Sequence, residues 1–212
     1  MNGDDSQALE DKHVKHIQWA RDHGIEIHGV TPAVLPHRGV GLVASKKIKK
    51  GQLLVFVPER AMLKASAATV KKHRLQRASP QAQLAAYLGL EAQEQSDRYV
   101  SSRKVWPTPE DFKSCMLAWS SEDEIRLLRK HAPPSVQKPL DRLLLDLKKD
   151  VDAVKHVCDT DNDDFMYHWI LVNTRSFHWK PDGVKTGAMV MCPFLDYMNH
   201  CPNGQGVRST PL

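Results

Sequence analysis

The stretch Pro193-Phe194-Leu195-Asp196-Tyr197-Met198-Asn199-His200-Cys201-Pro202-Asn203 decides how this chain is interpreted. Its apolar residues lead directly into an Asn-His pair. Burial of the apolar run would fix the backbone and hold Asn199 and His200 out to a ligand. An adenine edge offers an N6 donor beside an N7 acceptor, and the amide of Asn199 or the backbone beside it can bind that pair. A core histidine with its hydrogen bonds satisfied explains His200 equally well.

The composition fits one globular domain with a large insert, or two small domains. Hydrophobic residues make up 41% of the 212 residues and charged residues 26%, so we do not expect global disorder. The net charge of +5 is too small to argue for a nucleic-acid partner. The polar start at residues 1–5 lacks the apolar core of a secretory signal, and no apolar run is long enough to span a bilayer. We therefore expect a soluble protein of the cytoplasm or nucleus, with no membrane partner.

We predict no metal site. The four cysteines have neither C-x-x-C pairing nor zinc-ribbon spacing, which favours free thiols in a reducing compartment. Residues 159–164 are similar to the opening of a calcium loop. However, Asp164 stands at the turn position that requires glycine, and Ile170 stands where the loop requires glutamate. An acidic helix N-terminus is the better interpretation.

Residues 9–23 predict a short polar helix, with Val14, Ile17 and Ala20 on one side. Two of its histidines are three residues apart and could bind a metal, but no carboxylate or cysteine completes a set. We therefore expect a solvated histidine face. Its members are His13, His16 and His23.

From residue 25 to residue 63 the pattern is typical of short strands, with strands expected at 41–44 and 53–57. From 64 to about 160 the pattern is helical, with N-terminal capping signals at Thr108 and Ser121. Apolar residues of 140–154 fall on one helix face. Residues 165–172 are apolar nearly all round, which predicts a buried helix.

Two further pieces carry candidate chemistry. In Arg38-Gly39-Val40-Gly41-Leu42 two glycines lack Cβ atoms, so the backbone can approach a ligand closely, although a plain strand-entry turn explains them as well. A third glycine is missing, which argues against a dinucleotide fingerprint. Arg175, at the end of the buried helix, requires an anion from a ligand or from an internal ion pair.

Taken together, these pieces resemble the SET-domain methyltransferases. The closer resemblance is to the subgroup whose core is split by a helical insert, as in the Rubisco large-subunit and ribosomal-protein lysine methyltransferases. The resemblance runs from about residue 24 to the C-terminus. It rests on the opening strands at 38–44, 48–51 and 55–58, on the insert residues 119–120, 124 and 127–128, and on the later motifs at 174–177 and 195–200.

The resemblance implies an α+β fold: a SET-type β core of short strands, interrupted by a helical insert and incomplete at the C-terminus. It implies four segments. These are an N-terminal helix (1–23), the N-terminal part of the core (24–64), the insert (65–164) and the C-terminal part of the core (165–212). The family continues past the Asn-His motif into a Tyr-Gly segment that this sequence does not contain, so we expect a truncated chain. The zinc-binding cysteine cluster of the histone-directed SET proteins is also missing from the sequence.

The resemblance further implies S-adenosyl-L-methionine as cofactor and methyl transfer to a lysine of a non-histone protein. The cofactor would lie along Gly39, Val40, Gly41 and Leu42. Arg175 would sit near its amino-acid end, and Asn199 and His200 at its adenine end, with Asp196 supporting the site. We assign no catalytic residue and expect this chain alone to show little or no turnover. The alternative is a non-catalytic SET remnant that serves as a protein-interaction module.

Overall fold

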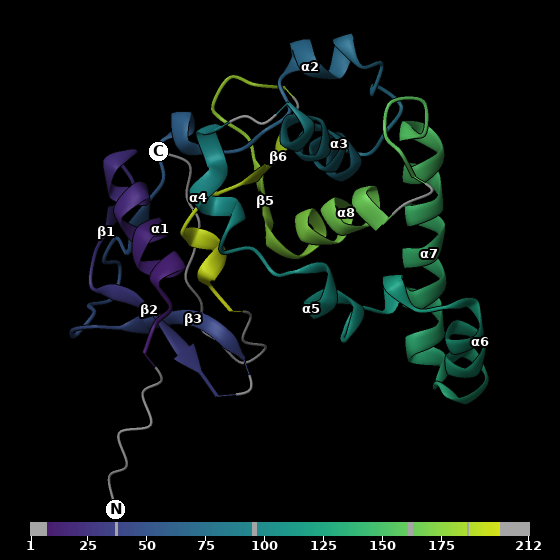
Figure 1. The fold of residues 1–212 in the computed structure, drawn as a ribbon, viewed down its shortest axis with the longest axis horizontal. Coiled ribbons are helices and arrows are strands. Elements are labelled where there is room, and N and C mark those ends of the chain that lie inside the picture. The colour runs from purple at the N-terminus through teal and green to yellow at the C-terminus, as the bar shows by residue number, and fades with distance from the viewer. Residues whose placement is uncertain (1–7, 37, 95–96, 161–162, 186, 200–212) are drawn as a thin grey trace, which may run out of the picture. The chain divides into compact units, whose positions relative to one another are not determined.

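The computed structural model describes residues 8–36, 38–94, 97–160, 163–185 and 187–199 (Figure 1). The chain divides into two compact units. The first comprises 1–63, 97–105 and 177–212, and the second comprises 64–96 and 106–176. Short strands gather in the first unit and helices make up the second, which confirms the expected α+β class. The four-segment division that the resemblance implies stays a prediction.

The first unit contains short strands joined in pairs. The strands are β1 (Glu26–Ile27), β2 (Val30–Leu35), β3 (Gly39–Ala44), β4 (Val55–Phe56), β5 (Ser176–Trp179) and β6 (Ala188–Met191). The pairs are β1 with β4, β2 with β3, and β5 with β6. The β2–β3 pair is antiparallel, with a register from Val30 opposite Ala44 to Leu35 opposite Gly39. This hairpin confirms the strand predicted at 41–44.

The strand predicted at 53–57 is shorter than expected, because only Val55 and Phe56 pair with β1. One further hydrogen bond, from the His28 N–H to the Leu54 carbonyl at 2.7 Å, continues the pairing outside the strand. Gly29 then takes a left-handed conformation with φ +71° and turns the chain away into β2. The partner strand therefore ends before it can pair with the rest of residues 53–57.

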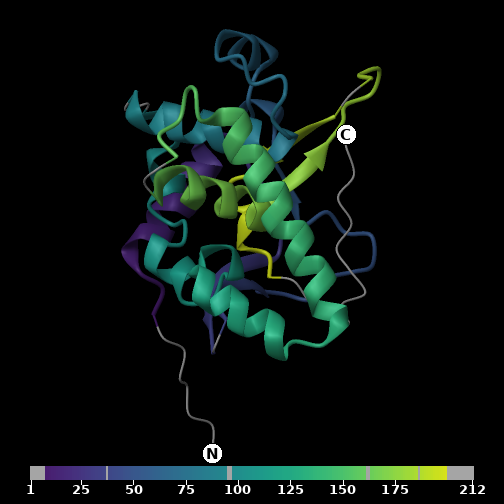
Figure 2. The same ribbon diagram turned by 90° about the vertical axis from the view of Figure 1, so that its right-hand side faces the viewer.

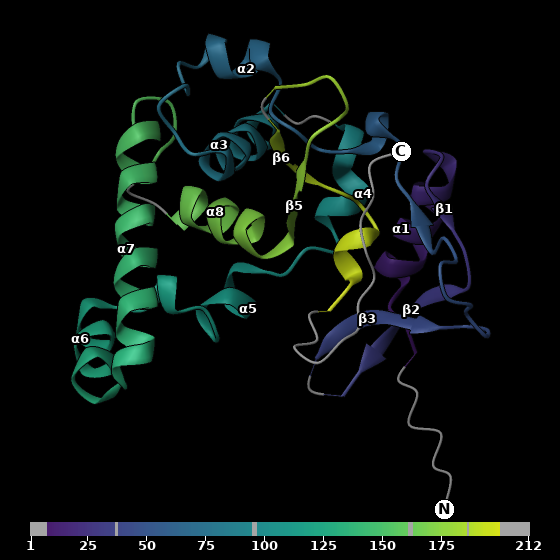
Figure 3. The ribbon, with the colours of Figure 1, turned by 180° about the vertical axis from the view of Figure 1, so that it is seen from behind.

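The helical elements of the first unit are α1 (Asp11–Asp22), η1 (Glu59–Ala61), η2 (Asp97–Tyr99), α4 (Val100–Arg103) and η4 (Leu195–Tyr197). Figures 1 and 3 show η4, in yellow, beside α1. A buried cluster lies where the two meet. Its members are Ala20, Ile25, Ala61, Phe194 and Tyr197.

The buried face of α1 differs from the one expected. His13 and His16 are 5% and 0% exposed, so the prediction of a solvated face is wrong for these two residues, whereas His23 is exposed. Val14, assigned to the apolar side, is 53% exposed. The buried stripe is His13, His16 and Ala20, spaced i, i+3, i+7, and the neutral imidazoles fill space as apolar rings do.

The second unit contains the longer helices. They are α2 (Ala67–Lys72), α3 (Pro80–Gln93), α5 (Pro109–Lys113), η3 (Leu117–Trp119), α6 (Glu122–His131), α7 (Pro134–Val154) and α8 (Asp163–Arg175). Helices α3 and α8 pack along each other, and Figure 2 shows the length of α7. Both predicted N-terminal caps are confirmed, because Thr108 and Ser121 each form a reciprocal capping box. None of the described helices combines the length and apolar character that a membrane span requires.

Asp150 joins two of these helices, and the sequence pattern gave no sign of it. It is 6% exposed, on the same face of α7 as the buried Leu147 and Val154. Its carboxylate accepts hydrogen bonds from the Ser79 N–H at 3.2 Å, the Ser79 hydroxyl at 2.8 Å and the Trp169 indole at 2.9 Å. The buried charge is therefore stabilised by three donors.

The predicted burial of α8 is confirmed, since Trp169 and its neighbours are buried.

Candidate functional site

The structure brings two of the predicted pieces together in the first unit. Asn199 follows η4, and its side chain lies directly on β3 at Gly41. A Cβ added to Gly41 would stand 2.6 Å from Asn199 Nδ2 and 2.6 Å from Leu35 Cδ1. A larger side chain at this position would have to displace Asn199 or Leu35. Gly41 is thus the position that lets the Asn199 amide approach the strand backbone.

The residues of β3 alternate between two environments. Val40 and Leu42 pack against the buried cluster that contains Phe194 and Tyr197. Gly39 and Gly41 alternate with them and so lie on the opposite face of the strand. Gly39 is exposed, has φ +68° and would present an added Cβ to open space. Gly41 is buried, with the Asn199 and Leu35 side chains over it. A ligand along this face would therefore meet the exposed Gly39 and, at Gly41, the Asn199 side chain.

The apolar run before Asn199 is buried, as the sequence predicted. Phe194 is fully buried, with φ 71° and ψ −40°. A positive φ is a genuine outlier for so bulky a residue, and such outliers persist only where surrounding contacts enforce them. This bend leads the chain into η4. Tyr197, expected to have a packing role, is 5% exposed in the same cluster.

Asp196 is hydrogen-bonded through its backbone to Cys192. The Asp196 N–H donates to the Cys192 carbonyl at 3.2 Å, and one carboxylate oxygen of Asp196 is buried. Burial, and secondarily the Asp196 charge, raises the pKa of the Cys192 thiol to about 12. Cys192 is therefore a packing residue rather than a nucleophile.

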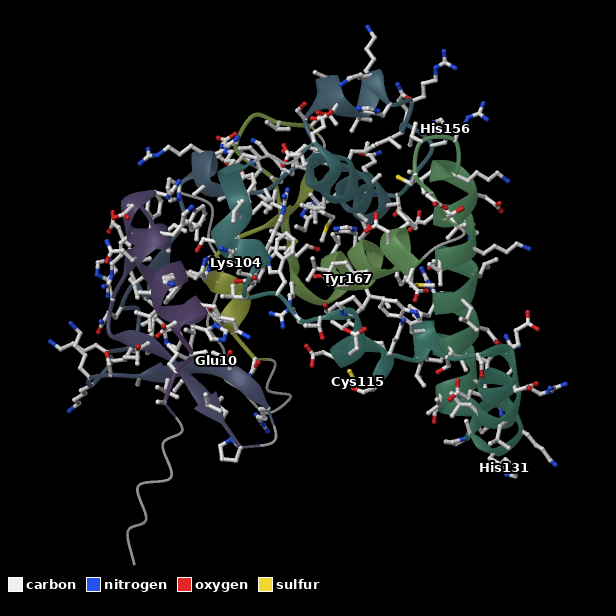
Figure 4. The ribbon with its side chains drawn as sticks, viewed as in Figure 1. Glu10, Lys104, Cys115, His131, His156 and Tyr167 are labelled. Atoms are coloured by element: carbon white, nitrogen blue, oxygen red, sulfur yellow. The ribbon has the colours of Figure 1, made fainter. Side chains whose placement is uncertain are left out.

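Arg175 is the last residue of α8 and belongs to the second unit, and its Nε is buried. Tyr167 lies on the same helix (Figure 4). Burial raises its pKa to about 12, and the nearby Arg175 charge opposes that rise. The Tyr167 hydroxyl donates to the Pro107 carbonyl at 3.0 Å.

His200 lies outside the described residues. Among the residues that are described, no three His, Cys, Asp or Glu side chains gather as metal ligands would.

Two residues of α1 that contact the motif were not predicted from the sequence. His13 Nδ1 and the Tyr197 hydroxyl are 2.7 Å apart, and the ring centroids of His16 and Tyr197 are 5.8 Å apart. A signal was present in the i, i+3, i+7 spacing of His13, His16 and Ala20. Histidine counts as polar in a hydrophobic pattern, which hides that stripe.

Comparison with known proteins identifies the fold. No protein-family model and no curated protein sequence matches the chain. Two crystal structures of the SET domain of LSMT match with a TM-score of 0.70. One, bound to MeLysine and AdoHcy, is 18% identical over 92% of this chain, and the other, bound to lysine and AdoHcy, is 17% identical over 93%.

A structure of Rubisco LSMT bound to sinefungin and monomethyllysine matches with a TM-score of 0.60 and 20% identity over 92% of this chain. In each case the chain spans 46% of the matched chain, just under half of its length. At these identities the likeness establishes the architecture, and it confirms the fold that the motifs predicted. The chain has the SET-domain fold.

Proposed function

We propose that this chain binds S-adenosyl-L-methionine and serves a protein-lysine N-methyltransferase activity directed at a non-histone protein. The observation that carries the proposal is the close approach of the Asn199 amide to the Cβ-free strand at Gly41. Support comes from the SET fold, since the matched structures are bound to AdoHcy or sinefungin and to lysine or its methylated forms.

The proposed roles follow from the chemistry of each group. The exposed Asn199 amide offers one donor and one acceptor, which suit the N6 and N7 edge of adenine. The open space at Gly39 leaves room for the ligand beside the β3 backbone, and the Asn199 side chain lies over Gly41. The forked guanidinium of Arg175 suits the carboxylate at the amino-acid end. His200 is proposed at the adenine end, with Asp196 supporting η4.

When bound, S-adenosyl-L-methionine supplies an electrophilic methyl group to a neutral lysine amine. The residues named above bind and orient; none of them is assigned a proton-transfer step. Most of the rate enhancement in such a site comes from holding the two reactants in line. We propose the cytoplasm or nucleus as the compartment of this chain.

Calorimetric titration with S-adenosyl-L-methionine tests the cofactor proposal. We expect saturable one-to-one binding that Asn199→Ala weakens about tenfold or more, the loss of about 1.4 kcal/mol. Asn173→Ala is the matched control, because the Asn173 amide donates to the Trp169 carbonyl of its own helix at 2.8 Å. Binding that Asn199→Ala leaves unchanged would contradict the proposed site.

Turnover is a separate question, and our prediction of little or no methyl transfer by this chain alone is tested with a labelled methyl donor. Incubation with core histones and with a lysine-rich non-histone protein mixture compares the two substrate classes. Methylation well above background that Asn199→Ala abolishes would refute the low-turnover prediction. Labelling of histones in preference to the other proteins would refute the substrate class.

A non-catalytic interaction module is the second candidate, and a groove in the second unit favours it. Leu117 and Leu127 are 44% and 60% exposed. With Ser120, Glu124, Leu128 and His131 they line a shallow, mostly apolar groove of about 580 Å³ between η3 and α6. Exposed apolar patches of this kind often mark protein contacts. Failure of the purified chain to bind S-adenosyl-L-methionine at millimolar concentration would favour this candidate.

A further inference from the structure

We propose that α1 is a positioning element of the cofactor site, in which His13 and His16 hold Tyr197 and thereby fix the orientation of Asn199. This inference rests on the proposed function and deepens it. It adds to the site a helix whose sequence pattern predicts a separate segment with a solvated face. His13 and Tyr197 are positioning residues here, because neither is proposed to touch the cofactor.

The first support is a buried hydrogen bond between distant parts of the chain. His13 Nδ1 and the Tyr197 hydroxyl are 2.7 Å apart, and each residue is 5% exposed. Buried polar groups that lose their partner are costly, so this bond ties η4 to α1 specifically. Tyr197 stands two residues before Asn199, too close along the chain for its backbone to move without moving Asn199.

The second support is the way aromatic rings surround Tyr197. The centroids of the His13, His16 and Phe194 rings lie 5.6, 5.8 and 5.8 Å from the centroid of its ring, at interplanar angles of 56°, 67° and 87°. The His16 ring also stacks on Trp19 at 5.5 Å and 14°. Tilted and edge-on contacts at these distances are favourable and restrict how the ring can turn.

The third support is the conformation of the chain at the start of η4. Phe194 has a left-handed backbone that only strong surrounding contacts maintain, and α1 supplies contacts to the cluster in which it is buried. Among the described residues, neither ring nitrogen of the fully buried His16 has a hydrogen-bond partner. The His16 ring is therefore held by packing against Tyr197 and Trp19, beside the proposed cofactor motif, and not by a hydrogen bond.

The test is a double-mutant cycle read by calorimetric titration with S-adenosylhomocysteine. We expect His13→Ala and Tyr197→Phe each to weaken binding about five- to tenfold. The double variant should bind no more weakly than the weaker single variant, because both changes remove one hydrogen bond. His13→Gln, which retains a group able to bond the hydroxyl, should bind within about twofold of wild type.

Gln18→Ala is the matched control. Gln18 lies on the same helix, and its side-chain amide donates to the Asp22 carboxylate at 2.8 Å at an exposed position. This variant should leave binding unchanged. Wild-type affinity in His13→Ala and Tyr197→Phe, or additive losses in the double variant, would overturn the positioning role.

A second readout does not depend on the cofactor. In two-dimensional NMR spectra the side-chain amide of Asn199 should shift in His13→Ala and return toward its wild-type position in His13→Gln. An unchanged Asn199 amide in both variants would overturn the inference even if the wild-type protein binds no cofactor. If the wild-type protein binds no cofactor but the Asn199 amide shifts in His13→Ala, the proposed function alone is contradicted.

Discussion

Acid should destabilise the first unit through His16. Burial, and secondarily the His13 charge, lowers the pKa of His16 from 6.5 to about 4 in the folded protein. The unfolded chain therefore binds more protons than the folded one between these two values, so stability is full above the unfolded pKa and falls as the pH drops toward 4. Linkage gives a loss of about 2 kcal/mol between about pH 7.5 and about pH 5 from this one group.

His16→Phe isolates that contribution, since phenylalanine keeps a flat ring against Trp19 and does not titrate. The assay is hydrogen exchange of the α1 amides in both proteins across the pH range, which reports the opening free energy of that helix. The opening free energy of α1 in wild type, relative to that in His16→Phe, should be about 2 kcal/mol lower near pH 5 than near pH 7.5. A difference that stays flat within about 0.5 kcal/mol would refute the burial of a neutral His16.

Three further predictions address other parts of the chain. Gly41→Ala should lower the free energy of unfolding in urea by about 1–3 kcal/mol and weaken methyl-donor binding, because the new methyl group displaces Asn199. Unchanged affinity would argue against a binding site formed by Asn199 over Gly41. Asp150→Ala should cost about 3 kcal/mol in the same assay, because it leaves the buried Trp169 indole and the two part-buried Ser79 donors without their acceptor; a loss below about 1 kcal/mol would contradict that network. Near pH 8, a disulfide reagent should label the exposed Cys115 rapidly and the buried Cys192, whose pKa is raised to about 12, only on unfolding; equal rates would contradict its burial.

Local signals in the sequence predicted the parts of the structure that depend on neighbouring residues. The capping boxes at Thr108 and Ser121 and the β2–β3 hairpin each depend on a few adjacent side chains. The structure also brings together Gly41 and Asn199, which lie far apart in sequence and which the resemblance to SET domains assigned to one site. The assignment of cofactor contacts to individual residues stays a prediction.

The features that the sequence did not reveal depend on tertiary contacts between polar residues. His13 and His16 look solvated in a hydropathy pattern, and only the approach of Tyr197 explains why they are buried. Asp150 likewise looks like one more surface carboxylate of a charged helix until Ser79 and Trp169 meet it. Burial of a polar group depends on its partner, and partners distant in sequence leave no periodic signal.

The central claim is that the Asn199 amide over the glycine face of β3 forms the methyl-donor site. A crystal structure of the chain with S-adenosylhomocysteine tests it most directly. We predict electron density for the adenine within hydrogen-bond distance of Asn199 and for the ligand along β3 at Gly39. Density for the ligand elsewhere, or no ligand density beside Asn199 at saturating ligand, would contradict this site.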